Sequence, residues 1–186
     1  MAILLKLYLH WFAYMDLADG VGPFVGLTLL SSVDALSSSW GCPVLFPPCS
    51  ATAALLFVAP KAPFSQPRNV IIGTALSAFI AVAIKRNCAS SMAPGFVRAV
   101  AVAATILASK LLNVVHPPAA AVAALCTGPA SGLGYRAVPA SILGPVFLIA
   151  VQRALMLAKG NYERRALADG VVTAKPSEPK SHLHSA

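Results

Sequence analysis

Charge is scarce in this sequence, and its scarcity argues against a soluble fold. Only 11% of the 186 residues are Asp, Glu, Lys or Arg, while 58% are hydrophobic and the mean hydropathy is +0.75. Soluble domains carry about 25% charged residues, so a soluble fold of this composition could not cover its surface. The composition therefore predicts a multi-span membrane protein, with room for about four to six crossings at ~20 residues each.

Acidic residues are the scarcer kind of charge. The chain has 6 acidic and 14 basic residues, for a net charge of +8. In a soluble protein this excess would suggest a nucleic-acid partner. Here the basic residues lie mostly in loops and in the tail, where the positive-inside bias of membrane proteins places them. We therefore expect the lipid bilayer as the partner, and no nucleic acid.

The sequence also lacks the spacings of metal, nucleotide and catalytic sites. Its 4 cysteines and 4 histidines have no partners at metal-ligand spacing, and neither a phosphate-binding loop nor a nucleophile elbow occurs. We therefore expect no cofactor, no metal and no enzymatic activity. An intramembrane enzyme would need Asp34, Lys110 and His116 within hydrogen-bonding reach of one another.

The apolar segments divide the chain into three parts. Residues 1–19 are predicted to form an interfacial segment, since aromatic side chains favour headgroup depth and no clear signal or transit peptide is visible. Residues 20–158 form the transmembrane domain, and residues 159–186 a polar, disordered tail. We expect an all-α bundle with long spans at 21–40, 69–84, 97–115 and 137–158, and shorter segments at 43–60 and 119–127. In the first span, Asp34 is either functional or close to water at the far end.

The two shorter segments resemble each other. FPPCSATAAL (Phe46–Leu55) aligns with HPPAAAVAAL (His116–Leu125) at a constant offset of 70 residues, which indicates an internal two-fold repeat. From Pro47 to Pro60 a helix would extend only roughly 21 Å, short of the ~30 Å hydrocarbon core. The segment is thus either a short broken helix or a span with an extended beginning. With three crossings per half the repeats are inverted, and with two they are parallel.

Short, Pro-interrupted segments in corresponding halves indicate the binding site of a transporter. A helix that begins at Pro-Pro directs its positive dipole end and unpaired N–H groups at what precedes it. Two such ends facing each other at membrane depth would form an anion site. The alternative is that both Pro pairs are kinks that only help the helices to pack.

At these residues the chain resembles the HPP family of integral membrane proteins. The motif that names the family is His116-Pro117-Pro118 here. A more specific likeness is LLFVAPKAPFSQPRNVIIG, from Leu55 to Gly73. Within it, order and spacing are kept at Pro63, Gln66, Pro67, Arg68, Asn69 and Val70. The resemblance covers about residues 20–158 and implies a compact four-span bundle; plant members are associated with nitrite movement across the plastid envelope.

Three places depart from the family pattern. Its Gly-Ala-Ser after the first Pro pair is Ser50-Ala51-Thr52, its Gly-Ala-Thr after His-Pro-Pro is Ala120-Ala121-Val122, and its Gly-Gly pair is Ile72-Gly73. If these small or polar groups touch the substrate, the departures imply a different substrate or weaker binding.

Arg68 is the first candidate for anion binding, because its guanidinium fork suits a planar oxyanion and Pro63 and Pro67 stiffen its loop. Its alternative is an interfacial anchor. Asn69 and Gln66 either add hydrogen bonds to the anion or cap the following helix. His116, at the helix start with Pro117 and Pro118, either couples a proton to transport or is structural. Ser50 and Thr52, in the opening turn of the first short helix, are candidates to line the path.

The leading functional hypothesis is a carrier or channel for a small anion such as nitrite. The alternative is a non-transporting scaffold or assembly protein. We expect a homo-oligomer, most simply a dimer, because four or five helices make a thin wall for a pore. The resemblance implies a plastid membrane as one location for a multi-pass protein of this kind.

Overall fold

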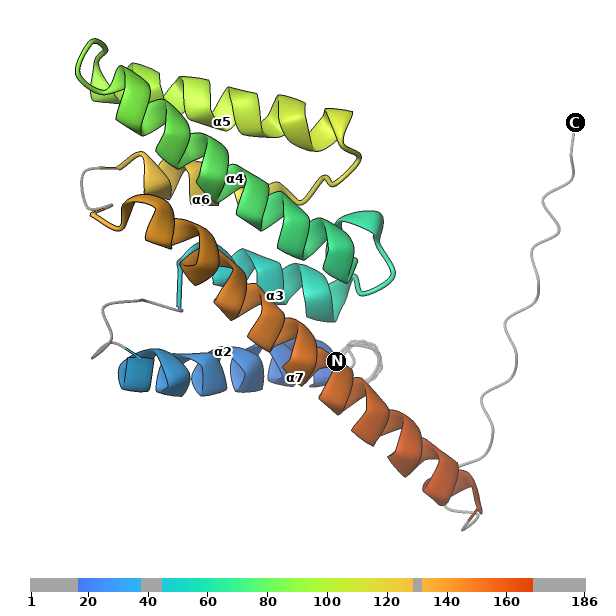
Figure 1. Cartoon of the computed structure of the whole chain (residues 1–186). Coiled ribbons are helices and arrows are strands. Elements are labelled where there is room, and N and C mark those ends of the chain that lie inside the picture. Colours follow the sequence, from blue (N-terminus) through green and yellow to red (C-terminus); the bar gives the residue numbers. More distant parts are fainter. Residues whose placement is uncertain (1–16, 38–44, 129–131, 169–186) are drawn as a thin grey trace, which may run out of the picture. The chain divides into compact units, whose positions relative to one another are not determined.

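The computed structural model describes residues 17–37, 45–128 and 132–168, and this part of the chain is all-helical, as predicted. It contains six α-helices and two short 3₁₀ turns, η2 and η3, and no strand (Figure 1). The elements are α2 (Leu17–Ser37), α3 (Pro48–Val58), η2 (Pro63–Ser65), α4 (Pro67–Cys88), α5 (Pro94–Leu111), α6 (Pro117–Cys126), η3 (Gly134–Arg136) and α7 (Ala137–Ala168).

Proline sets the start of four of these helices. Helices α3, α4, α5 and α6 each begin at a proline, at Pro48, Pro67, Pro94 and Pro117. Proline suits this position because its fixed φ fits the helix and because the first N–H of a helix has no intrahelical acceptor. The Pro-rich stretches of the sequence are therefore the boundaries of the bundle's helices.

Three helical stretches are long and apolar enough to cross a membrane: Pro67–Cys88, Pro94–Leu111 and Gly134–Lys159. Helix α2 has 21 residues, but its apolar part, Val21–Leu36, is shorter than these. Helices α3 and α6 have only 11 and 10 residues. At 1.5 Å per residue each extends roughly 15 Å, about half of the hydrocarbon core. The segment at 43–60 therefore holds a short helix.

Two clusters of buried residues hold these helices together. The first joins α2, α3, α4 and the first part of α7 through Leu30, Leu56, Val70 and Leu148. The second joins α4, α5, α6 and the start of α7, and most of its members are alanines, among them Ala78, Ala81, Ala101, Ala123 and Ala137. Small side chains let helix backbones approach closely, which is the usual packing in membranes. Helices α4, α5 and α6 accordingly lie side by side (Figure 1).

The predicted N-terminal and C-terminal segments can be compared with the structure only in part. Helix α7 continues to Ala168, beyond the predicted start of the tail at residue 159. Residues 159–168 contain Lys, Glu, Arg, Ala and Leu, which favour a helix even where the sequence is polar. The chain divides into two compact units, residues 1–152 and 153–186, and all eight predicted site residues lie in the first. The predicted interfacial segment lies almost wholly outside the described residues, as does the tail from residue 169.

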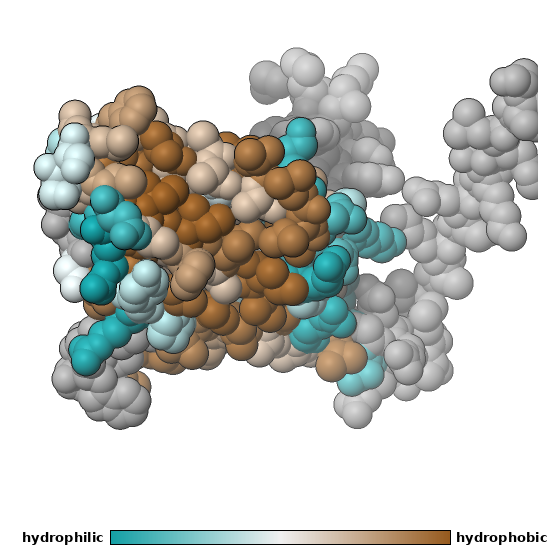
Figure 2. Space-filling model, turned by 45° about the horizontal axis from the view of Figure 1, so that its top comes forward, coloured by the Kyte–Doolittle hydropathy of each residue, from teal (hydrophilic) through white to brown (hydrophobic). Residues whose placement is uncertain are grey.

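Large apolar side chains remain exposed on the first unit. Phe24 and Leu36 of α2 are 70% and 77% exposed, and Leu107 and Leu111 of α5 are 60% and 76% exposed. Figure 2 shows one such face, which is hydrophobic across a broad band with hydrophilic residues at its edges. A lipid environment accounts for apolar side chains exposed on this scale.

Candidate functional site

His116 joins the two Pro-Pro helices. It is the residue that precedes α6, and its side chain is only 3% exposed. Its Nε2 lies 3.1 Å from the hydroxyl oxygen of Thr52, in the second turn of α3. Its Nδ1 lies 2.9 Å from the carbonyl oxygen of Phe64, in η2. One imidazole thus connects α6, α3 and the loop before α4, which the sequence separates by more than 50 residues.

The partners of the ring decide where its proton lies. A carbonyl oxygen only accepts, so Nδ1 carries the hydrogen and donates it to Phe64. In the neutral ring, Nε2 is then an acceptor for the Thr52 hydroxyl. That hydroxyl is also 3.2 Å from the carbonyl oxygen of Pro48, its alternative acceptor. If Nε2 gains a proton, it donates to Thr52, and the hydroxyl must donate to Pro48 instead. The geometry therefore accommodates both charge states of His116.

Helix α4 encloses this junction. A Cβ on Gly73 would lie 2.9 Å from the carbonyl oxygen of Val114 and 3.1 Å from Cβ of His116, closer than side chains normally approach. Ser77, one turn later, donates its hydroxyl hydrogen to the carbonyl oxygen of Ala119 in α6. Gly73 belongs to the motif that resembles the family, so the sequence indicated that this position is important. No feature of the sequence indicated a role for Ser77.

The starts of the two Pro-Pro helices offer fewer unpaired backbone N–H groups than a helix start usually does. Each pair of prolines removes two N–H groups. In α3 the next two, of Cys49 and Ser50, donate to the carbonyls of Phe46 and Pro47 at 2.8 and 3.2 Å. In α6 the N–H of Ala119 donates to the carbonyl of His116 at 2.9 Å. An anion here would therefore depend on side chains and the helix dipoles more than on backbone N–H groups.

The side-chain hydrogen bonds of the candidate residues near the loop, Gln66 and Asn69, do not involve His116. Asn69 donates its side-chain amide to the carbonyl oxygen of Pro63 at 2.8 Å, and Gln66 donates to the carbonyls of Pro60 and Ala62, both at 3.3 Å. These bonds fix the loop from α3 to α4, and neither side chain caps α4. Arg68 is exposed at the start of α4 and makes no hydrogen bond or ion pair with other described residues.

The remaining candidate site residues differ in their exposure to solvent. Pro118 is buried beside His116, whereas Pro117 is exposed. Ser50 is exposed and donates its hydroxyl hydrogen to the carbonyl oxygen of Pro47 at 2.8 Å, which leaves its oxygen as an acceptor. Of the eight predicted site residues, the structure thus joins His116 to Thr52 directly, with Pro118 in the same buried region.

Asp34 has a structural contact. Its carboxylate accepts a hydrogen bond from the backbone N–H of Leu45 at 2.9 Å, which ties the end of α2 to the chain just before α3. Neither hydrogen bond of His116 involves Asp34 or Lys110. Among the described residues, no group of three or more His, Cys, Asp or Glu side chains is arranged to hold a metal ion.

The charged residues in a long stretch of the sequence, which includes the predicted site residues, are all basic. Between Asp34 and Glu163 the sequence contains no acidic residue. The same stretch contains Lys61, Arg68, Lys85, Arg86, Arg98, Lys110, Arg136, Arg153 and Lys159. A stretch of chain whose charges are all positive favours the approach of anions over cations.

Comparison with known proteins agrees with the fold. The family model for the HPP transmembrane region matches residues 14–165. A transmembrane protein of Dictyostelium discoideum is 34% identical over 107 residues, which cover 55% of this chain and 37% of that protein. Another from the same organism is 36% identical over 78 residues, covering 41% of this chain and 25% of that protein. The chain thus matches well under half the length of these relatives. No solved structure matches it.

Proposed function

We propose that this chain, which belongs to the family of HPP transmembrane regions, moves a small anion such as nitrite across a membrane. The observation that carries the proposal is the junction of two helices that are each too short to cross, joined by the buried contact of His116 with Thr52. Broken helices that meet inside a bundle are the arrangement in which transporters place their substrate sites.

The charge pattern supports an anion as the substrate. No carboxylate lies between Asp34 and Glu163 to repel one, and most of the basic residues there lie in loops or near helix ends. Rings or clusters of Lys and Arg select anions at pores. Nitrite is small, planar and singly charged, so it suits an Arg fork and demands little space.

The predicted residues take distinct roles in this proposal. Arg68, exposed and without a partner among described residues, attracts the anion at one mouth. Gln66 and Asn69 hold the loop that positions it, through their bonds to loop carbonyls. His116 and Thr52 form the buried polar contact between the two short helices, and Ser50 borders the path from α3.

The architecture we propose has four crossings. Helix α2 is the fourth span beside the three longer apolar stretches, and α3 and α6 are half-helices related by the internal repeat. We propose further that the protein acts as a homo-oligomer without enzymatic activity, in a plastid membrane. Cross-linking in membranes that yields only monomer would contradict the oligomer.

Uptake of nitrite into liposomes that contain the purified protein tests the transport proposal. We expect wild-type flux above that of empty liposomes, and a loss of at least tenfold for Arg68→Ala, because removal of a charged hydrogen-bond partner costs about 1.5–3 kcal/mol. Lys61→Ala is the matched control, since it removes an exposed cation from the loop that leads to α4. Circular dichroism and size-exclusion profiles establish that both variants fold.

Two further comparisons refine the result. A dependence of flux on an imposed pH gradient that disappears in His116→Asn would assign the proton to His116. Equal losses of flux in Arg68→Ala and Lys61→Ala would mean that Arg68 acts only through its contribution to the surface charge and not as a specific binding residue. Absence of flux from folded wild-type protein, for nitrite and for other small anions, would leave the scaffold as the function.

A further inference from the structure

A cavity of about 380 Å³ lies where α4 and α6 end and α5 begins. It is separate in sequence and in lining residues from the His116 junction. Lys85, Ala89, Val97, Arg98 and Gly128 contribute to its walls. None of the residues that line it is acidic.

Two cations from different helices converge on one point of this cavity. Lys85 of α4 donates a hydrogen bond from Nζ to the carbonyl oxygen of Gly128 at 2.8 Å. Arg98 of α5 brings its Nη2 to 3.9 Å from the place where a Cβ on Gly128 would stand. The contact of Lys85 has a structural purpose, since it satisfies a carbonyl at the end of α6. Arg98 is exposed and has no such bond among described residues, so it gives the cavity a charge that the fold does not use.

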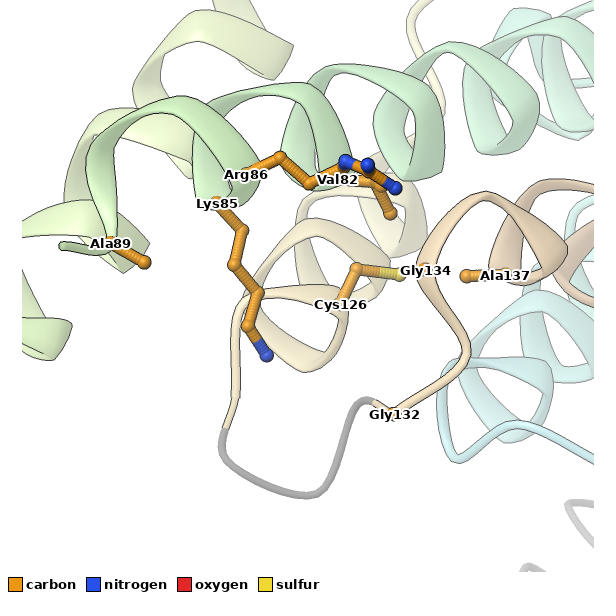
Figure 3. Close-up of a pocket in the computed structure, with 8 residues that line it drawn as sticks. All are labelled: Val82, Lys85, Arg86, Ala89, Cys126, Gly132, Gly134 and Ala137. Carbon is orange, nitrogen blue, oxygen red and sulfur yellow. The ribbon is translucent and has the colours of Figure 1, made fainter.

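A second cavity, of about 290 Å³, adjoins the first, and Lys85 and Ala89 line both. Figure 3 shows that Lys85 points towards the end of α6, while Arg86 turns away along α4. The guanidinium of Arg86 lies 5.3 Å from the centre of the Tyr135 ring, over which it stacks. Much of the remaining wall is apolar, with Val82, Cys126 and Ala137. This cavity therefore offers apolar surface next to the two converging cations.

The combination suits a phosphate group that carries an apolar substituent. Phosphate oxygens accept several hydrogen bonds from Arg and Lys at once. Basic pockets between transmembrane helices, at the level of the headgroups, bind anionic lipids. Lys85 and Arg86 end a membrane-spanning stretch, where the interface is expected.

We propose that Arg98 and Lys85 bind the phosphate group of an anion, presented by an anionic phospholipid whose glycerol and upper acyl region lies along the adjoining cavity. This site does not depend on the transport proposal, because it concerns other residues and needs no flux. The same phosphate chemistry could be supplied by free phosphate, so the experiment contains an arm for each source.

The experiment measures binding to the purified full chain by native mass spectrometry and by thermal stability in neutral detergent. The lipid arm compares phosphatidylglycerol with phosphatidylcholine, and the free arm compares inorganic phosphate with chloride. We expect retention of phosphatidylglycerol over phosphatidylcholine and a raised Tm. In Arg98→Gln the affinity should fall about fivefold, as expected for one basic residue near the membrane surface.

Two variants separate a built site from diffuse charge. Lys61→Gln removes an exposed cation from the loop after α3 and should leave binding unchanged. Ala89→Leu keeps every charge but fills space common to both cavities, so it should weaken binding as much as Arg98→Gln.

Protection by inorganic phosphate alone, lost in Arg98→Gln, would support the site with free phosphate as the source. Equal losses in Lys61→Gln and Arg98→Gln would overturn it, and so would unchanged binding in Ala89→Leu. Failure of wild-type protein to prefer either phosphate probe would overturn it as well.

Discussion

Helices α3 and α6 each begin at a pair of prolines, and the sequence Phe46–Leu55 aligns with His116–Leu125. The two helix starts nevertheless make different contacts at the junction. The residue before the prolines is Phe46 at the start of α3 and His116 at the start of α6. Phe46 packs against the first hydrophobic cluster, whereas His116 is buried and makes two hydrogen bonds. Position 52 is Thr in α3, and its counterpart at 122 is Val in α6.

The difference shows that the two helix starts complement each other. The imidazole occurs only before α6 and its hydroxyl partner only in α3. Thr52 and Val122 are both 2% exposed, so the two positions are equally buried and differ in polarity alone. A symmetrical pair of helices could pack together without any polar contact. The contact of His116 with Thr52 makes the junction specific, and it is the feature to break first.

His116→Phe puts at the start of α6 the residue that Phe46 provides before α3, and it should have the largest effect. It removes two hydrogen bonds and leaves the carbonyl of Phe64 without its partner. A larger ring must also fit beside Gly73. We expect a loss of about 2–4 kcal/mol in the free energy of unfolding, measured by denaturant titration in micelles.

His116→Asn is the matched control, because its amide nitrogen takes the place of Nδ1 and retains the bond to Phe64. It should lose about half as much as His116→Phe. Full stability in His116→Phe would mean that the ring is held by packing alone and that the polar contacts contribute nothing.

Gly73→Ala should cause the next largest loss of stability, because the added methyl group would occupy space between α4 and the residues that precede α6. The added Cβ would lie 2.9 Å from a backbone oxygen, Val114 O, which cannot move as a side chain can. We expect a loss of about 1–3 kcal/mol, typical of overpacking. Ile72→Ala is the control, since Ile72 is 42% exposed and faces away. If Gly73→Ala is as stable as Ile72→Ala, the close approach of α4 to α6 is unimportant.

The positions of Ile72 and Gly73 also explain a departure from the family pattern. The sequence has Ile72-Gly73 where the family has two glycines, and the sequence alone could not say which glycine matters. The structure places position 73 against the backbone of the His116 loop and position 72 at the surface. An Ile is accommodated at 72 because nothing packs closely there.

The starts of the two short helices were predictable from the sequence because proline acts locally. The predicted Pro-Pro starts are confirmed, with α3 beginning at Pro48 and α6 at Pro117. The partner of His116 was not predictable, because Thr52 and Phe64 are brought to it by tertiary packing over 64 and 52 residues. The roles of Gln66 and Asn69 were open for the same reason: an amide can bind a ligand, a helix end or a loop carbonyl. Only the geometry shows that both donate to loop carbonyls.

A smaller effect is expected from Thr52→Val, which gives α3 the residue that α6 has at the aligned position without a change in shape. The lost interhelical hydrogen bond should cost about 0.6–1 kcal/mol, as is usual between helices in membranes. Thr52→Ser retains the hydroxyl and should lose less.

The converse change, Val122→Thr, should be nearly neutral, because the new hydroxyl can donate to the carbonyl four residues earlier, as Thr52 can to Pro48. A double-mutant cycle of Thr52→Val with His116→Asn measures the contact itself. A coupling energy near zero would show that the two side chains are neighbours without a shared hydrogen bond. The asymmetry between α3 and α6 would then be one of residue type only.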